Sequence, residues 1–289
     1  MGIINNMKTG IKVYKPNYRH ELGFFKTWSV MFRNILNART LIWQLFKRDF
    51  FSAYKKSFIG VAWVFLIPLF GIVNWVFLNS TGILQPGNLD IPYPVYVLLG
   101  TSCFQLFLGF FDSAKNTLQA GNEFIMQVKY PHEAILFKQA ANHIARYIIG
   151  FLMTILILVI FQIKPHWKII FFPLVSLPLF FLGSGLGLII AMVSVVSIDV
   201  NNVISKVMIL LVYTTPVIYT DNVSSDLIQN IIKWNPLTYL VCSARDIILK
   251  GKLYDTSGYF IAAGLSLIVF LISWRLFFIS EDRLIERMI

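Results

Sequence analysis

Residues 169–198 read IIFFPLVSLPLFFLGSGLGLIIAMVSVVSI, thirty consecutive positions between Lys168 and Asp199 without a charged side chain. Crossing the hydrocarbon core of a bilayer takes about 20 apolar residues in a helix, at ~1.5 Å per residue. A transmembrane strand would alternate apolar and polar residues, which this stretch does not do. The stretch therefore predicts a membrane-spanning helix.

The glycines inside this stretch indicate helix packing. The segment Gly183-Ser184-Gly185-Leu186-Gly187 superficially resembles a dinucleotide-binding loop, but it lies in the middle of the uncharged run. Gly183 and Gly187 have the small-xxx-small spacing of membrane helix interfaces. We expect a packing surface or a locally flexible helix here. The sequence also contains no phosphate loop of the G-x-x-x-x-G-K-[ST] form.

The rest of the chain repeats the same pattern, with five further uncharged runs of 14 to 33 residues. Charged residues make up only 13% of the 289 positions, where a soluble domain carries about 25%. A soluble globule, a disordered chain and a disulfide scaffold are excluded, the last because there are only 2 Cys. We predict an all-α integral membrane protein with six transmembrane helices, near residues 58–79, 94–114, 142–163, 169–197, 202–220 and 257–280. The fifth reaches spanning length only if Lys206 snorkels to an interface.

The distribution of Lys and Arg predicts the orientation. With the N-terminus in the cytoplasm, the inside segments hold 18 of these residues and the outside segments hold 6. By the positive-inside rule, both termini are then cytoplasmic. The same asymmetry explains the net charge of +11, so we expect no nucleic acid partner.

Residues 1–56 are interpreted as a cytoplasmic N-terminal segment, followed by a transmembrane domain over 57–289. The segment is too long, too basic and too polar for a signal peptide. It contains apolar residues at helical spacing, with basic and polar residues between them: Phe32, Ile35, Ile42, Phe46 and Phe50. This pattern predicts an N-terminal amphipathic interfacial helix on the inner leaflet. Packing on a soluble partner is the alternative.

The segment 221–256 between the last two spans is 36 residues long, more than a simple connection needs. Its apolar residues recur at helical spacing on both sides of Asn235-Pro236, where proline interrupts a helix. We expect two short amphipathic helices that dip partway into the outer leaflet. Cys242 falls in this exterior segment and Cys103 in the second span, so we expect two free thiols.

The sequence offers little chemistry of its own. The four His have no mutual spacing or acidic partner typical of a metal site, and the exterior carboxylates form no D-x-D pair. A membrane glycosyltransferase or lipid-modifying enzyme is therefore less favoured. An ion-coupled carrier is disfavoured too, because such carriers place ionisable groups near the bilayer midplane. We expect no catalytic residue and no metal.

Four short motifs occur in order along the chain: Arg48-Asp49 with Tyr54-Lys55-Lys56-Ser57, Gly60, Trp63 and Pro68; Lys129-Tyr130-Pro131-His132-Glu133; Thr215-Pro216-Val217-Ile218-Tyr219; and Asn235-Pro236-Leu237. Together they resemble the membrane (permease) subunit of type 2 ABC exporters for polysaccharides, which export O-antigen, capsule or teichoic acid. Members of that family often have Arg-Asp after the fourth span, whereas this chain has Ile198-Asp199. A salt bridge in that loop is therefore not expected.

The resemblance implies the transmembrane subunit of an ATP-driven exporter that moves a lipid-linked polysaccharide through a homodimeric channel in the bacterial cytoplasmic (inner) membrane. O-antigen on an undecaprenyl carrier is the first expectation, and teichoic acid or capsule is the alternative within the family. The implied partners are a second copy of the chain, two ABC ATPase subunits, the lipid-linked glycan and membrane lipids. The chain itself would hold no cofactor and would not be an enzyme, because ATP and Mg would bind the separate subunit.

The resemblance also implies a coupling helix, at about 119–138, that docks into the ATPase. The residues expected at that contact are Glu123, Gln127, Lys129, Tyr130, Pro131, His132 and Glu133. Re-entrant exterior helices at about 221–256 would form a gate, with Pro216, Asn235 and Pro236 at its breaks. A merely solvated loop is the alternative for the coupling segment.

Two further groups of residues follow the path of the substrate. A basic cluster before the first span would attract the phosphates of the lipid carrier or anionic lipid: Lys47, Arg48, Tyr54, Lys55 and Lys56. A glycan inside hydrocarbon loses several kcal/mol for each unsatisfied hydroxyl, so its channel needs polar partners and aromatic faces. The candidate channel lining is Trp63, Phe65, Asn74, Trp75, Tyr213, Thr214 and Tyr219. Lipid contact, packing or an interfacial belt is the alternative for each aromatic.

Overall fold

The computed structural model describes residues 3–5, 12–14, 23–55, 62–87, 89–118, 132–195, 197–221, 223 and 225–286. Within them, one short antiparallel strand pair precedes a body built of helices, so the all-α prediction holds for that body. The elements are β1 (Ile3–Asn5), β2 (Lys12–Tyr14), α2 (Phe24–Asn37), α3 (Arg39–Lys55), α4 (Trp63–Ser80), α5 (Tyr93–Lys115), α7 (His132–Ile160), η2 (Trp167–Phe171), α8 (Phe172–Ser194), α9 (Ile198–Leu210), η3 (Leu211–Tyr213), α10 (Asp226–Trp234), α11 (Pro236–Leu249) and α12 (Thr256–Glu286).

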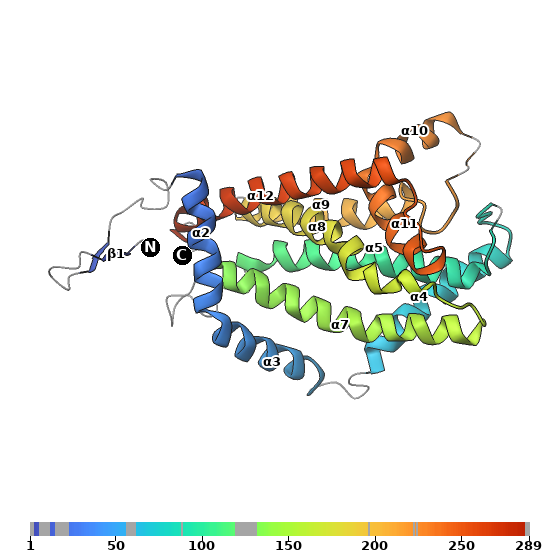
Figure 1. Cartoon of the computed structure of the whole chain (residues 1–289), viewed down its shortest axis with the longest axis horizontal. Coiled ribbons are helices and arrows are strands. Elements are labelled where there is room, and N and C mark those ends of the chain that lie inside the picture. The colour runs from blue at the N-terminus through green and yellow to red at the C-terminus, as the bar shows by residue number, and fades with distance from the viewer. Residues whose placement is uncertain are drawn as a thin grey trace.

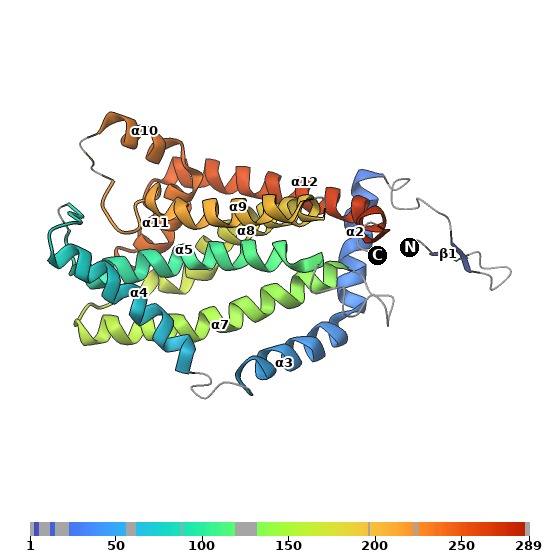
Figure 2. The ribbon, with the colours of Figure 1, turned by 180° about the vertical axis from the view of Figure 1, so that it is seen from behind.

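Four helices in the described residues are long and apolar enough to cross a membrane: Tyr93–Lys115, Ala134–Ile160, Trp167–Ser194 and Thr256–Ser280. They run along the long axis of the molecule, and α2 lies across one end of them (Figure 1). The opposite end carries α10 and α11 (Figure 1). From behind, α4 crosses the bundle obliquely over α5 and α7 (Figure 2). We refer to the two ends as the α2 end and the α10 end.

The packing of α8 against its neighbours depends on the predicted glycine surface. A Cβ on Gly183 would lie 2.7 Å from the carbonyl oxygen of Phe107 on α5. A Cβ on Gly187, one turn further, would overlap the carbonyl oxygen of Phe111. Gly185 faces the other way, against the backbone of Phe270 on α12. The small-xxx-small prediction is therefore confirmed, since α5 and α8 approach to backbone contact only because these positions lack a side chain.

The amphipathic stretch near the N-terminus forms two helices, α2 and α3, which meet at Ala38. One face of α2 is buried at Met31 and packs on the end of α12, where Trp28 and Phe32 contact the ring of Trp274 edge-on at 5.5 and 5.7 Å. Along α3, Trp43 stays exposed. The apolar face is thus divided between the chain's own bundle and the surface.

Two predicted helix boundaries are wrong. The third long helix, α7, begins at His132 rather than near 142, so the last part of the predicted coupling helix, 132–138, belongs to it. In these first turns Ala134, Ile135 and Leu136 are buried. Lys138, one turn further, pairs with Asp49 of α3. The fifth helix, α9, ends at Leu210, so the continuous helix predicted over 202–220 is wrong from residue 211 onward. The cause lies in the turn that follows.

Candidate functional site

The chain leaves helical geometry after α9 because of local side-chain chemistry. Pro216 has no N–H to donate, and its ring would clash with the preceding turn of a helix. The hydroxyl groups of Thr214 and Thr215 both donate to the carbonyl oxygen of Leu211, at 3.1 and 2.9 Å. Such side-chain bonds compete with the backbone ladder. The result is a 3₁₀ turn followed by irregular backbone over residues 214–220, which we call the 214–220 turn.

Helix α5 holds this turn from one side through two tyrosines. The hydroxyl of Tyr93 donates to the carbonyl oxygen of Ile218 at 3.1 Å. The hydroxyl of Tyr96, one turn further, lies 2.9 Å from the carbonyl oxygen of Tyr219 and 3.4 Å from that of Pro216. Carbonyl groups that have left the helix ladder thus regain donors inside the protein, as buried backbone requires.

Helix α11 and its capping residue Asn235 also bind this turn. The Asn235 side-chain amide donates to the carbonyl oxygen of Thr214 at 3.1 Å and to Oγ1 of Thr215 at 3.0 Å. Further along α11, Nη1 of Arg245 donates to the carbonyl oxygen of Pro216 at 3.1 Å. The turn is therefore clamped between two helices, and its shape depends on both.

The predicted break at Asn235-Pro236 is confirmed. Helix α10 ends at Trp234 and α11 begins at Pro236, where proline occupies the first helical turn without losing a hydrogen bond. Asn235 caps α11, since its Oδ1 accepts the N–H of Leu237 at 3.0 Å. The two helices differ more than predicted: α10 buries only Ile232, whereas nearly all of α11 is buried against α5, α8 and α12.

An ion pair lies inside this buried helix. Arg245 and Asp246 each retain 5% of their exposure, and Nε of Arg245 lies 3.1 Å from Oδ1 of Asp246. The guanidinium also covers the ring of Tyr96 at 4.3 Å from its centroid. A buried pair needs partners for all of its polar atoms, and here the Pro216 carbonyl supplies one of them. Arg245 therefore joins α11, α5 and the 214–220 turn.

This pair is not predicted from the sequence, because adjacent charged residues usually lie on an exposed helix face. Ser243 and Lys250 share a helix face with Asp246, so the sequence has no local signal that the pair is buried. Cys242, in the predicted exterior segment, is fully buried in α11. The prediction of two free thiols is confirmed for Cys103 and Cys242.

The predicted channel aromatics come together in part, next to the 214–220 turn. The rings of Trp75 on α4 and Tyr213 meet edge-on, with centroids 6.1 Å apart. The hydroxyl of Tyr219 donates to the carbonyl oxygen of Tyr213 at 2.7 Å, and Thr214 directly follows Tyr213 in the chain. Trp63 and Asn74 are exposed elsewhere on α4, and the side chain of Phe65 lies outside the described residues.

The predicted entrance cluster lies on α3 at the α2 end. Lys47 and Arg48 are exposed there; Lys47 lies over the ring of Trp43 at 5.5 Å, and Arg48 pairs with Asp49 at 2.7 Å. Tyr54 and Lys55 belong to the last turn of α3, but their side chains lie outside the described residues, as does Lys56.

A second ion pair, which sequence reasoning also missed, connects this surface helix to α7. Nζ of Lys138 lies 2.7 Å from Oδ2 of Asp49, and the Lys138 side chain is only 6% exposed. Partial burial alone would raise the pKa of Asp49. The hydrogen bonds from Lys138 and Arg48, together with the charges of these two residues, lower it by more, so the pKa of Asp49 lies below its usual value. Helix α3 is thereby attached to the first turns of α7.

We expect Asp49→Asn to loosen α3 from α7, because Lys138 then remains buried without its charge partner. A group whose pKa is lowered in the folded state contributes its stability above the unfolded pKa of 3.8 and loses it as the pH falls through the lower folded value. The difference in unfolding temperature between the wild type and Asp49→Asn should therefore be constant from pH 7 to about pH 5. This difference in unfolding temperature should shrink only below pH 3.8. Narrowing between pH 7 and about pH 5 would contradict the assignment.

The predicted coupling residues cannot be placed in the same way. Glu123, Gln127, Lys129, Tyr130 and Pro131 lie outside the described residues. His132 and Glu133 form the first two positions of α7, and their side chains are outside the description too.

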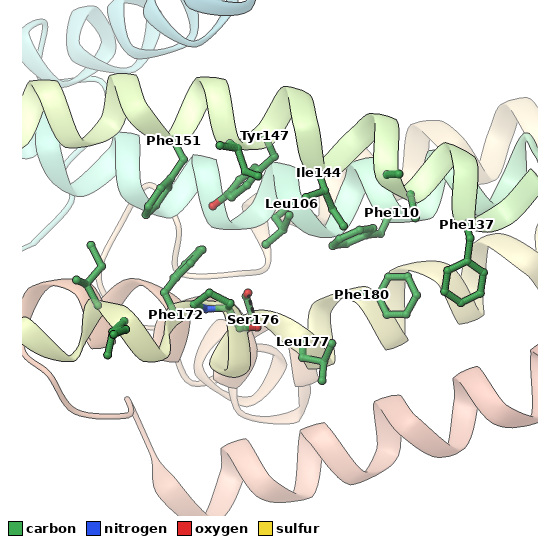
Figure 3. Close-up of a pocket in the computed structure, with 16 residues that line it drawn as sticks. Leu106, Phe110, Phe137, Ile144, Tyr147, Phe151, Phe172, Ser176, Leu177 and Phe180 are labelled. Atoms are coloured by element: carbon green, nitrogen blue, oxygen red, sulfur yellow. Dashed lines mark hydrogen bonds between the residues drawn. The ribbon is translucent and has the colours of Figure 1, made fainter. Parts of the chain in front are cut away.

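A large apolar groove lies between α5, α7 and α8, with a volume of about 700 Å³. Tyr147 and Phe151 of α7 point toward Phe172 of α8 at this groove (Figure 3), and both rings stack on that of Phe172. The hydroxyl of Ser176 is bonded to the carbonyl oxygen of Pro173. The groove is thus walled almost wholly by hydrocarbon and aromatic groups, which suit apolar chains and not a hydrated sugar.

In the described part of the chain, no group of three or more His, Cys, Asp or Glu side chains could hold a metal ion. The side chain of His143 on α7 lies over Gly109 of α5, with Nε2 3.1 Å from the carbonyl oxygen of Leu106. Its position is accounted for by helix packing.

The chain is similar in sequence to a known family of proteins. Residues 40–249 match the family described as ABC-2 type transporter. A protein of Myxococcus xanthus named "O-antigen export system permease protein RfbA" is 21% identical over 254 residues, which cover 87% of this chain and 95% of the relative. A protein of the same name from Klebsiella pneumoniae is 21% identical over 211 residues, 71% of this chain and 79% of the relative. Because the family match covers well over half of a chain with several helices able to cross a membrane, the chain belongs to the ABC-2 type transporter family of membrane proteins.

Proposed function

We propose that this chain is the transmembrane subunit of an ATP-driven exporter of lipid-linked O-antigen polysaccharide. Two copies form the channel in the bacterial cytoplasmic membrane, two ABC ATPase subunits drive it, and the carrier is an undecaprenyl lipid. Family membership and the names of the two relatives support this function. The structural observation that carries it is the 214–220 turn, clamped by α5 and the buried α11. Irregular backbone at membrane depth is tolerated where protein buries it or where it lines a pathway.

The proposed topology has six crossings with both termini in the cytoplasm. The first crossing is α4, with 18 residues and a length of about 27 Å. The fifth is α9 extended by η3 and the 214–220 turn; the 13 residues of α9 alone reach about 20 Å. The α2 end then faces the cytoplasm, and α10 and α11 form a re-entrant exterior hairpin. Its gate is the point where Asn235 contacts the turn.

The proposed path begins at the basic residues of α3 and ends at the aromatic residues beside the turn. Lys47 and Arg48 are exposed and cationic, as a headgroup phosphate requires. Trp75, Tyr213 and Tyr219 offer ring faces and hydroxyls near the far end of α4 and η3. A sugar has apolar C–H faces and a hydrogen-bonding rim, so this combination suits it.

We propose that ATP hydrolysis in the partner subunit moves this chain through the segment before α7. The ATPase docks on residues 119–138, whose last turns are the beginning of α7. Lys138 in those turns pairs with Asp49, so a displacement of α7 would also move α3 and its basic residues. Docking and substrate entrance are thereby connected through one ion pair.

The docking proposal predicts a selective defect. We expect Lys129→Ala combined with Glu133→Ala to reduce ATP-dependent export at least tenfold, because both charges would face the ATPase, while membrane insertion is unchanged. The reduction is measured as glycan reaching the exterior per unit of membrane-inserted protein. The matched control is Asp226→Asn with Lys233→Gln, which removes one charge of each sign from α10. Equal export by the coupling variant and this control would refute the docking assignment.

A further inference from the structure

A second cavity lies at the α10 end, on the side of the 214–220 turn where Arg245 contacts it. Its volume is about 530 Å³, within the range of about 300–1,000 Å³ typical of small-ligand sites. The loop between α4 and α5, the α7–η2 connection, the turn and the second half of α11 contribute to its walls. Unlike the lining of the apolar groove, its lining includes the ion pair of Arg245 and Asp246.

The walls of this cavity are fixed by contacts among themselves. The N–H of Thr220 donates to the carbonyl oxygen of Pro86 at 2.8 Å, which fastens the α4–α5 loop to the turn. Gly87 has a φ of +88° in this loop, and a Cβ there would overlap Oγ1 of Thr220. The Tyr254 hydroxyl donates to the Asp221 carboxylate, next to Thr220 in the chain. The cavity is therefore preformed, which limits the entropy that a ligand must lose.

The charges of the lining disfavour an anion. Asp90, Asp221 and Asp246 contribute three carboxylates, against the two cations Arg245 and Lys250. Both cations already contact Asp246, at 3.1 and 3.3 Å. Burial is the main cause that raises the pKa of Tyr254 well above its usual value, and the neighbouring Asp221 raises it too. The Tyr254 hydroxyl is therefore protonated at neutral pH.

The remaining lining favours a neutral ring with many hydroxyls. Leu89, Ile91, Ile163 and Leu249 provide apolar surface beside these carboxylates. Carboxylates accept hydrogen bonds from hydroxyl groups at both oxygens, and hydrocarbon side chains cover C–H faces. A pyranose presents both kinds of surface at once.

We propose that this cavity binds one pyranose unit of a saccharide at the exterior side of the 214–220 turn. The inference rests on the proposed function for its ligand, since an exported glycan would deliver sugar units to this end. Pro216 and Thr220 belong to both the turn and the cavity wall, so an occupant contacts the turn directly. Binding of a sugar in this cavity would therefore act on the turn whose Pro216 carbonyl oxygen accepts a hydrogen bond from Arg245.

Saturation-transfer NMR on the full chain in lipid nanodiscs, without ATPase or carrier lipid, tests the site. The probes are glucose, galactose, mannose, rhamnose and N-acetylglucosamine, with inorganic phosphate as the anionic comparison. We expect transfer to at least one sugar and none to phosphate. Asp90→Asn should weaken binding about fivefold, because a neutral acceptor replaces a charged one, and Leu89→Trp should abolish it by filling the cavity. Asp226→Asn, on the exposed α10, is the control and should bind as the wild type does.

Two results would overturn the inference: no transfer to any sugar in the wild type, or equal transfer in the wild type, Asp90→Asn and Leu89→Trp. An unfolding temperature for each variant separates loss of binding from loss of fold, and Asp90→Asn changes no volume. ATP-dependent export is measured separately. Export without sugar binding removes this inference alone, whereas sugar binding without export removes the proposed function and leaves the site.

Discussion

Replacement of Arg245 by methionine is expected to lower the unfolding temperature of the purified chain sharply or to prevent folding. The substitution leaves Asp246 buried at 5% exposure without its nearest cation, and it removes the donor to the Pro216 carbonyl. Removing one partner of a buried ion pair costs about 3–5 kcal/mol. That is a large part of the about 5–15 kcal/mol by which a typical domain is stable.

The matched control is Lys250→Met, because Lys250 contacts the same carboxylate at 3.3 Å but its side chain is 58% exposed. An exposed pair contributes about 0–1 kcal/mol, so this variant should unfold close to the wild-type temperature. The double variant Arg245→Met with Asp246→Leu should recover part of the loss, since no charge is then left buried. Fluorescence-detected size exclusion after heating measures all three. Equal loss in Arg245→Met and Lys250→Met would show that the pair does not hold α11.

Replacement of Gly187 by alanine is expected to have the second largest effect, although it adds only one methyl group. The new Cβ would overlap the carbonyl oxygen of Phe111 and would lie 2.7 Å from Cβ of Ala114, so α5 and α8 must separate. Overpacking of a tight interface costs about 1–3 kcal/mol. Gly187→Leu should prevent the two helices from packing at all.

Gly150→Ala is the matched control, since Gly150 also lies within a long helix but has nothing within 4 Å of its Cβ position. Alanine there should stabilise the helix by about 0.5–1 kcal/mol. Unfolding temperatures measured in the same detergent test this: Gly187→Ala should lower the temperature and Gly150→Ala should raise it. A neutral Gly187→Ala would mean that α5 and α8 are not in backbone contact.

Much of this packing was predictable because local chemistry decides it. In hydrocarbon each backbone group must be satisfied within its own segment, so long uncharged runs form helices. The spacing of Gly183 and Gly187 marks one helix face without knowledge of its partner. Asn235-Pro236 marks a helix start, since asparagine caps and proline fits the first turn.

The parts that could not be predicted depend on partners far apart in the chain. Arg245 and Asp246 resemble exposed residues in the sequence, and only the Pro216 carbonyl, 29 residues away, explains a guanidinium in a buried helix. Lys138 and Asp49 are 89 residues apart. The early end of α9 has a local cause in Thr214, Thr215 and Pro216, but the absence of charge over 207–220 concealed it.

The proposed exporter moves polysaccharide with energy that a partner ATPase obtains from ATP hydrolysis. Translocation of lipid-linked O-antigen can be measured in vesicles that contain the chain together with its proposed ABC ATPase partner. The account predicts that glycan reaches the far side only when ATP is hydrolysed, and not with the chain alone under a proton or sodium gradient. Translocation driven by an ion gradient without ATPase would contradict it, as would chemical modification of the glycan by the chain without transport.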